Sequence, residues 1–476
     1  MNKPAPATHP GGLVGVMAFI GIVAALMQTL VIPLIGELPS LLDTTTSDAS
    51  WVITATLLSG AVTTPVAGRL GDMYGKRRMM LMCTVPLILG SVVCALASSV
   101  LPMIAGRALQ GLGMGMIPLG ISALRDLLPP ERLNSAIALM SSSMGIGGAL
   151  GLPVAAIVAE HTSWRVLFWG AAALSMLIAV LLWAFVPATP ASGARGRFDA
   201  IGALGLGVAL VCLLLPISKG ADWGWTSGAT LGLFTAAALT FVVWGKWELR
   251  IRDPLVDLRA NADRQVLLTN TASVVVGFAM YAQSLIIPQL LQLPEATGYG
   301  LGQSMLAMGL WMAPSGLMMM AVSPLGARLS SARGSRITLL TGCLVIALGY
   351  GSAVFLMGTT WGLILVTCIC GSGIGLAYGA MPALIMSAVP LSATASANSV
   401  NALMRSVGTS ISAAVVGVVL AQMSIQIDGY TVPTEVGFRT GLSIGCGAAF
   451  LAAAIALAIS SAQGNQAVEN PAVVKV

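Results

Sequence analysis

The stretch Gly68-Arg-Leu-Gly-Asp-Met-Tyr-Gly-Lys-Arg-Arg78 places one acid and four cations between two long apolar runs. Charged side chains such as Asp72 and Arg77 are too costly to hold in hydrocarbon, so a chain in a bilayer must leave it here and re-enter it after Arg78. Gly71 and Gly75 permit a sharp reversal and a close approach of neighbouring helices. The stretch therefore predicts a tight loop between two membrane-spanning helices.

The composition of the whole chain predicts a polytopic membrane protein. Of its 476 residues 57% are hydrophobic and 8% are charged, whereas soluble domains carry roughly 25% charged residues. A helix needs about 20 apolar residues to cross a bilayer. The apolar runs are continuous and do not alternate as the strands of a transmembrane barrel do. We therefore expect an all-α membrane fold.

The apolar runs number fourteen, in an order of six, two and six. They lie near residues 12–36, 50–67, 79–99, 101–123, 135–159, 165–186, 200–217, 226–245, 266–292, 302–325, 337–357, 360–386, 398–422 and 438–460. This order predicts five regions along the chain. They are an N-terminal six-helix half (13–187), two linking transmembrane helices (199–247), a cytoplasmic linker (248–264), a C-terminal six-helix half (265–460) and a cytoplasmic tail (461–476).

The basic residues predict the orientation of the chain, because cytoplasmic loops retain Lys and Arg. With the N-terminus inside, eighteen of the 23 Lys and Arg residues fall on the cytoplasmic side. We expect both termini in the cytoplasm of a cell whose plasma (inner) membrane holds the protein. The net charge of +6 is then a signal of topology and of contact with the lipid bilayer. It indicates no nucleic acid partner.

An internal repeat relates the two six-helix halves. Four residues of the first loop recur 259 positions later, and a Gly-x-Gly-x-Gly triplet recurs after 260 positions: Leu70, Asp72, Gly75 and Arg77 as Leu329, Ser331, Gly334 and Arg336, and Gly111–Gly115 as Gly371–Gly375. Glycine triplets alone are also ordinary helix-packing positions. The shared offset favours a duplication, the arrangement that many transporters use for alternating access.

The loop from Gly68 to Arg78 resembles the signature of the major facilitator superfamily, found between its second and third spans. A simple stop-transfer cluster explains the cations but not Asp72 or the glycines. Gly106–Gly115 resembles the Arg-x-x-Gln-Gly-x-Gly motif of drug:proton antiporters. Gly147, Gly151 and Pro153 are similar to the helix-packing motif of antiporters, although Leu152 intervenes. Three further segments resemble the fourteen-span branch of that family: Trp164–Trp169, Asp253–Asp257 and Pro288–Gln292.

The resemblance implies a major facilitator fold and a secondary active transporter. The expected function is proton-coupled export of lipophilic or amphiphilic drugs or antibiotics by alternating access. Its partners are the small-molecule lipophilic substrate and protons, and we expect a monomer. The alternatives are an exporter of a specific metabolite or peptide, or a transport-inactive membrane receptor.

No enzyme, cofactor or metal site is expected. Gly441-Leu-Ser-Ile-Gly445 has the spelling of a nucleophile elbow but lies in an apolar span without a preceding strand. The chain has two histidines, which makes a protein-built zinc or haem site implausible. The seven cysteines all fall in apolar runs and are interpreted as packing residues.

One departure from the family concerns proton coupling. The fourteen-span branch carries an acid deep in its first span, where this chain has Leu26-Met-Gln-Thr-Leu-Val-Ile-Pro33. No acid lies in the middle third of any predicted span. The remaining candidates for proton coupling are Glu37 and Glu160 from outside and Asp72 from inside. The two glutamates are also explained as solvated charges at helix ends.

Arg107, with Gln110, is the buried cation that the resemblance connects to proton exchange or gating. It should face the bundle interior with carbonyls, Gln110 or an outer glutamate as acceptors; alternatively it only ties spans 1, 4 and 5 together. Arg405, nearer the cytoplasmic end, could snorkel, pack or belong to a cytoplasmic gate. Asp72 should accept hydrogen bonds from helix N-terminal amides or pair with an arginine, holding the N-terminal half against the linking helices. Arg77 is assigned to the same conformational group.

The substrate cavity is predicted from amides, aromatic rings and flexible methionines, which suit a promiscuous surface. The candidates are Gln28, Thr29, Asn270, Tyr281, Gln283, Met308 and Trp311. Since no buried carboxylate is expected among them, neutral, anionic, zwitterionic or delocalised monocationic lipophiles should be preferred over dications. The two linking helices repeat nothing and are expected to pack at the periphery.

Overall fold

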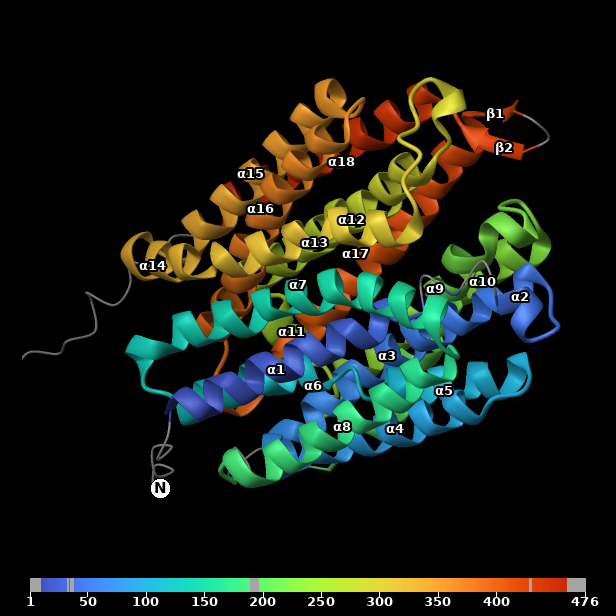
Figure 1. The fold of residues 1–476 in the computed structure, drawn as a ribbon. Helices are drawn as coiled ribbons and strands as arrows, with labels where there is room; N and C mark the ends of the chain where they lie inside the picture. The colour runs from blue at the N-terminus through green and yellow to red at the C-terminus, as the bar shows by residue number, and fades with distance from the viewer. Residues whose placement is uncertain (1–9, 32–33, 35–37, 189–196, 428–429, 460–476) are drawn as a thin grey trace, which may run out of the picture.

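The computed structural model describes residues 10–31, 34, 38–188, 197–427 and 430–459. Its first part is a chain of long helices joined by short turns (Figure 1). They are α1 (Pro10–Thr29), the short α2 (Leu38–Leu41), α3 (Thr46–Tyr74), α4 (Lys76–Leu96), α5 (Val100–Leu112), α6 (Met116–Leu127), α7 (Pro130–His161) and α8 (Arg165–Phe185).

The rest of the described chain continues in the same way. Its helices are α9 (Ala200–Trp223), α10 (Gly228–Glu248), the short α11 (Leu258–Asn261), α12 (Arg264–Gln292), α13 (Met305–Ala321), α14 (Ser323–Arg333), α15 (Ser335–Leu356), α16 (Thr360–Ala388), α17 (Thr394–Gln422) and α18 (Glu435–Ala458). Two 3-10 turns, η2 (Glu295–Thr297) and η3 (Leu391–Ala393), lie between helices. Strands β1 (Ser424–Ile427) and β2 (Tyr430–Pro433) form an antiparallel hairpin in which Ser424 lies opposite Pro433.

Fourteen stretches of the described chain are long and apolar enough to cross a membrane. Two of them are interrupted spans: α5 continues into α6 after a break at 113–115, and α13 continues into α14. Only helices or closed barrels satisfy backbone polar groups in lipid. The protein is therefore a multi-pass membrane protein of the all-α class, as its composition predicts.

Each half of the molecule has its own apolar core. One core is built on α1 and α3–α8, with Met17, Leu119 and Phe168 among its fully buried side chains. The other is built on α12–α18, with Ile286 and Phe438. The halves meet mainly along two helix pairs, α7 with α13 and α3 with α17, with further contacts of α7 with α14 and α16 and of α6 with α17. Two cores joined at two seams are a geometry in which the halves can move relative to each other.

Small residues allow the tightest helix contacts. A Cβ added at Gly147 on α7 would lie 2.0 Å from the Ile22 carbonyl oxygen on α1, and one at Gly151 would lie 1.8 Å from the Thr29 hydroxyl. At the seam between the halves, a Cβ at Gly316 would lie 2.1 Å from the Gly145 carbonyl oxygen. The glycines of the predicted packing motif therefore sit where α7 touches α1.

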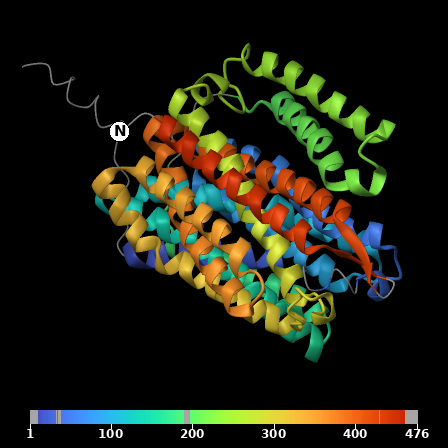
Figure 2. The same cartoon turned by 90° about the horizontal axis from the view of Figure 1, so that it is seen from above.

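The two linking helices stand at one side of the other helices (Figure 2). α9 packs against both α3 and α17, whereas α10 packs mainly on α9. A small apolar cluster joins Leu206 and Leu210 of α9 to Val400 and Leu403 of α17. The hairpin of α9 and α10 thus covers the seam between the halves from outside, in keeping with its expected peripheral place.

The helices α1, α7 and α12 begin at one end of the bundle, where α3, α6 and α14 finish. We call this the basic end, because it holds the cations of 69–78 together with Arg125 and Arg132, and we call the opposite one the far end. Gly75 makes the turn from α3 to α4 there with φ +96°, and its repeat partner Gly334 joins α14 to α15 with φ +89°. These two matching left-handed glycines place the internal repeat in corresponding turns of the two halves.

Candidate functional site: contacts between the halves at the basic end

Asp72 is fully buried at the seam between α3 and α17. Its carboxylate accepts hydrogen bonds from the backbone N–H groups of Ala395 at 3.1 Å and Ser396 at 2.8 Å, in the first turn of α17. The first turn of a helix has unpaired N–H groups and the positive end of the helix dipole, so it stabilises an anion. Asp72 therefore binds the N-terminal half to the C-terminal half at the basic end.

Helix N-terminal amides were among the expected partners of Asp72, but the expected neighbouring element was wrong. The amides belong to α17, a helix of the C-terminal half, and not to the linking helices. The reason is the packing of α3: its last turns lie directly against α17, where a Cβ at Gly68 would overlap Ser399. α9 covers this contact from outside.

Three further charged side chains, Arg125, Lys76 and Asp126, make polar contacts at the basic end near Asp72. The Arg125 guanidinium of α6 donates to the Val389 carbonyl at 3.2 Å and to the Thr394 hydroxyl at 2.8 Å, again across the halves. Lys76 lies 3.9 Å from the Asp72 carboxylate and donates a short hydrogen bond to Asp126. We call the set Asp72, Arg125, Thr394, Ala395 and Ser396 the Asp72 gate.

Arg77 does not take part in the Asp72 gate. Its guanidinium donates to the Trp183 carbonyl at 2.6 Å, near the end of α8 in the same half. Its repeat partner Arg336 donates to the carbonyls of Ala456 and Leu457 at the end of α18. Because a cation at a helix C-terminus is favourable, the same bond stabilises the last helix of each half. This repeated contact supports a role within a half for Arg77.

Arg107 lies inside the N-terminal half, in the second turn of α5 from the far end, and is 2% exposed. It donates to the Gln110 side-chain oxygen at 2.7 Å, the Met27 carbonyl at 3.1 Å and the Val52 carbonyl at 3.3 Å. Gln110 in turn donates to the Ser91 hydroxyl at 2.8 Å. The expected acceptors, carbonyls and Gln110, are thus present.

The helices that Arg107 joins differ from the expectation in one member. Its acceptors lie on α1 and α3, which are spans 1 and 2, whereas span 5 was expected. Span 5 is α7, which packs between α1 and the helices α13 and α16 of the other half, and α5 is not among its main neighbours. Met27 is in the last turn of α1, so the cation also stabilises the C-terminal end of that helix.

Only Gln28 of the predicted cavity residues shares a cavity with Arg107. A small cavity of about 20 Å³ is lined by Met27, Gln28, Thr56, Arg107 and Gln110 among others. Such a volume holds about one water molecule. Thr29, another predicted cavity residue, instead packs against Gly151 of α7.

A second polar network lies in the C-terminal half. The Arg405 guanidinium donates to the Asn401 side chain at 2.7 Å and lies over the Tyr378 ring at 5.0 Å. Asn401 donates to Asn270 at 3.0 Å and to Ser273. Arg405 therefore does not snorkel. Asn270, predicted as a cavity residue, is a buried link of this network and donates to Asn261 of α11.

The other predicted cavity residues are dispersed within the C-terminal half. Gln283 and Met308 are buried in its core, and Tyr281 is half-buried. The Trp311 indole donates to Gln303 at 2.8 Å and its ring lies 5.5 Å from that of Trp361, which is largely exposed. The structure does not bring these residues together with Gln28. Glu37 lies outside the described residues, and Glu160 is in α7 but its side chain is not described.

Sequence reasoning missed most partners of the gate. The Arg125 side chain of α6 donates across the seam to the Thr394 hydroxyl. In the other direction, the Asn398 side chain of α17 donates to the Ser122 hydroxyl of α6 at 3.2 Å. A signal was present in the polar run Thr394-Ala-Ser-Ala-Asn-Ser-Val-Asn401 at the start of an apolar span. Such a run is costly in lipid unless its groups are paired inside the protein.

Two helical halves with separate cores, joined by a charged contact at one end, define a transporter-like membrane fold. A family model described as Major Facilitator Superfamily matches residues 17–413. The chain belongs to the major facilitator superfamily.

Similar proteins include named exporters. The chain is 30% identical over 374 residues to the multidrug resistance protein Stp of Mycobacterium tuberculosis, which covers 78% of this chain and 68% of Stp. It is 28% identical over 393 residues to the tetracenomycin C resistance and export protein of Streptomyces glaucescens, covering 79% and 69%.

Solved structures show the same fold at low sequence identity. The human organic anion transporter MFSD10 superposes with a TM-score of 0.65 at 16% identity, over 94% of this chain and 99% of that one. The proton:xylose symporter XylE gives a TM-score of 0.65 at 13% identity, over 93% and 95%.

Proposed function

We propose that the protein is a proton-coupled exporter of lipophilic or amphiphilic compounds that works by alternating access. The observation that carries the proposal is the Asp72 gate, a charged contact made by one half on the first turn of a helix of the other. Membership of the superfamily and the similarity to proteins named for multidrug resistance and antibiotic export support it.

In this proposal the basic end faces the cytoplasm, with both termini there, in the plasma membrane. The excess of Lys and Arg at that end supports the orientation. The protein then has its cytoplasmic side closed by the Asp72 gate. Export requires the gate to open and admit a compound from the cytoplasm or the inner leaflet.

Asp72 is the acid that we assign to coupling. Its ionised carboxylate is attracted by two α17 amides and by Lys76, and a proton on the carboxyl group removes that charge. Protonation therefore weakens the Asp72 gate, and loss of the proton closes it again. Arg107, Gln110 and the one-water cavity beside Gln28 are assigned to positioning α1, which packs beside the transport path in this proposal.

A flux assay tests this function. Purified protein in liposomes is given a neutral fluorescent lipophile and an imposed pH gradient, with Asp72→Asn and Asp48→Asn compared at equal abundance. Asp48 is an exposed acid at the start of α3, so it controls for loss of charge. We expect gradient-driven flux from the unmodified protein and from Asp48→Asn. We expect about tenfold less from Asp72→Asn, because charge-assisted hydrogen bonds are lost.

The possible results separate the alternatives. Flux that ignores the pH gradient would refute proton coupling while leaving transport intact. Absence of flux for all lipophiles tested would favour a specific metabolite exporter or a transport-inactive receptor. Full flux from Asp72→Asn would remove the gate from the mechanism.

A further inference from the structure

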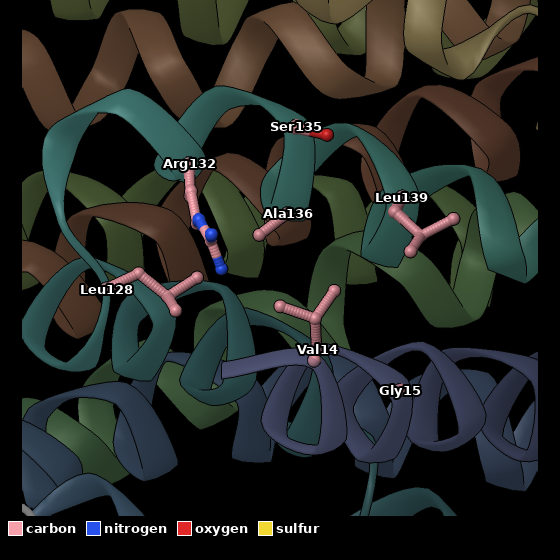
Figure 3. Close-up of a pocket in the computed structure, with 8 residues that line it drawn as sticks. Val14, Gly15, Leu128, Arg132, Ser135, Ala136 and Leu139 are labelled. Carbon is pink, nitrogen blue, oxygen red and sulfur yellow. The ribbon is translucent and has the colours of Figure 1, made fainter. Parts of the chain in front are cut away.

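A cavity lies away from the Asp72 gate, between α1 and α7 at the basic end (Figure 3). Its volume is about 500 Å³, within the range of ligand pockets. It is lined by Gly11, Val14, Gly15, Leu128, Arg132, Ser135, Ala136 and Leu139. All these residues belong to the N-terminal half, so the cavity does not depend on how the halves meet.

The cavity has a charged entrance and an apolar interior. In Figure 3 the Arg132 side chain points from α7 into the space above α1, and Leu128 and Val14 border that space. Arg132 and Ser135 lie in the first turns of α7, whereas Leu139 lies deeper along the span. At a rise of about 1.5 Å per residue, the distance from Arg132 to Leu139 along the helix is roughly 10 Å.

Two glycines keep the floor of the cavity open. A Cβ added at Gly11 or Gly15 of α1 would meet no atom within 4 Å. This differs from Gly147 and Gly151 in the same helix pair, which are filled by close contacts. Gly11 and Gly15 are therefore not needed for close contact between α1 and α7, and they leave the space beside α1 open.

The charge of the site is uncompensated by neighbouring groups. Within the described residues, Arg132 makes no side-chain hydrogen bond or ion pair, and no acid lines the cavity. The nearby acid Asp126 is taken by Lys76. Next to a membrane surface, a free guanidinium above an apolar slot is complementary to a phosphate with an attached hydrocarbon chain.

We propose that this cavity binds one anionic phospholipid of the cytoplasmic leaflet, with its phosphate on Arg132 and Ser135 and the start of an acyl chain between Val14 and Leu139. The lipid fills the wedge between α1 and α7 at the end where the Gly147 and Gly151 contacts no longer hold them together. This site is independent of the exported compound, and no group of the Asp72 gate contributes to it.

Native mass spectrometry of the purified full chain in detergent tests the site with palmitoyl-oleoyl phosphatidylglycerol as the probe. We expect one saturable adduct. Arg132→Gln should weaken it about fivefold or more, because one cation near a membrane surface contributes about that factor. Gly15→Leu should abolish it by filling the cavity. The matched controls are Arg328→Gln, an exposed arginine at the same end, and Gly447→Leu, another glycine with open space.

Each other outcome overturns the proposal. If Arg132→Gln and Arg328→Gln weaken the lipid adduct equally, the lipid is attracted by the basic residues of this end in general and does not occupy a defined site. Equally tight binding of dioleoylglycerol, or of the neutral lipophile used for flux, means that the phosphate is not recognised. Full competition by inorganic phosphate means that the chain is not recognised. An unchanged adduct in Gly15→Leu, with Gly447→Leu as the folding control, places the lipid elsewhere.

Discussion

Arg107 is a buried cation that is held without an acidic partner among the described residues. Its guanidinium N–H groups donate to the Gln110 side-chain oxygen and to backbone carbonyls on two other helices. We call this arrangement of donors the fork. A point charge cannot reproduce such a fork. At the residue scale, the geometry of the side chain and its charge are therefore both required.

Arg107→Lys should consequently be damaging although the charge is kept. The lysine can satisfy one acceptor and leaves others unpaired, at roughly 1.5 to 3 kcal/mol for each hydrogen bond to a charged group. We expect a lower thermal midpoint in detergent and reduced flux. Arg439→Lys is the control, because the exposed pair of Arg439 and Glu435 should contribute little. Equal midpoints for the two variants would show that the fork is unimportant.

At the scale of elements, the pairing of α1 with α7 rests on glycines on one face of α7. Gly147 faces the Ile22 carbonyl, whereas Gly148, its neighbour in sequence, faces open space.

Gly147→Ala should destabilise the protein by about 1 to 3 kcal/mol through overpacking. Gly148→Ala should be neutral or stabilising by up to about 1 kcal/mol, because alanine is the better helix former. The free energy of unfolding of each variant in the same detergent measures this, and similar values for both would contradict the contact.

The positions of the helices and of the glycine turns could be predicted from the sequence, whereas most contacts between helices could not. The span count, the glycine turn at Gly75 and its repeat at Gly334 follow from charge, length and spacing. The helix that supplies the partners of Asp72 did not follow, since it lies 323 residues away in the chain and a carboxylate accepts from backbone N–H groups of any sequence. The helices that supply the carbonyl acceptors of Arg107 did not follow either, because backbone carbonyls leave no side-chain signal. The predicted cavity residues were chosen by type, and type does not tell which face of a helix meets the other half.

At the scale of the whole molecule, the distribution of charge should determine what is exported. Within the described parts of the two halves, the cations inside the spans are Arg107, which is buried, and Arg405, which is partly buried, whereas the fully buried acid Asp72 is engaged at the basic end. A dication brought between the halves would lack a compensating carboxylate. We expect efflux of a neutral or anionic lipophile to exceed that of a rigid dication of similar size. Preferential efflux of the dication would contradict this and would require an acid in the path.

The measurement that tests the account most directly is the distance between two spin labels, one on each half, at each end of the molecule. Pulsed electron paramagnetic resonance measures these distances for the protein in lipid nanodiscs. Labels at Glu131 and Arg333 report the basic end, and labels at Thr162 and Ala296 report the far end; all four positions are exposed or at the surface. In a chain without its seven cysteines, we predict a short distance at the basic end that lengthens in Asp72→Asn while the far-end distance shortens. Distances at both ends that are the same with and without the Asp72 carboxylate would contradict the claim that this contact closes one side of an alternating-access transporter.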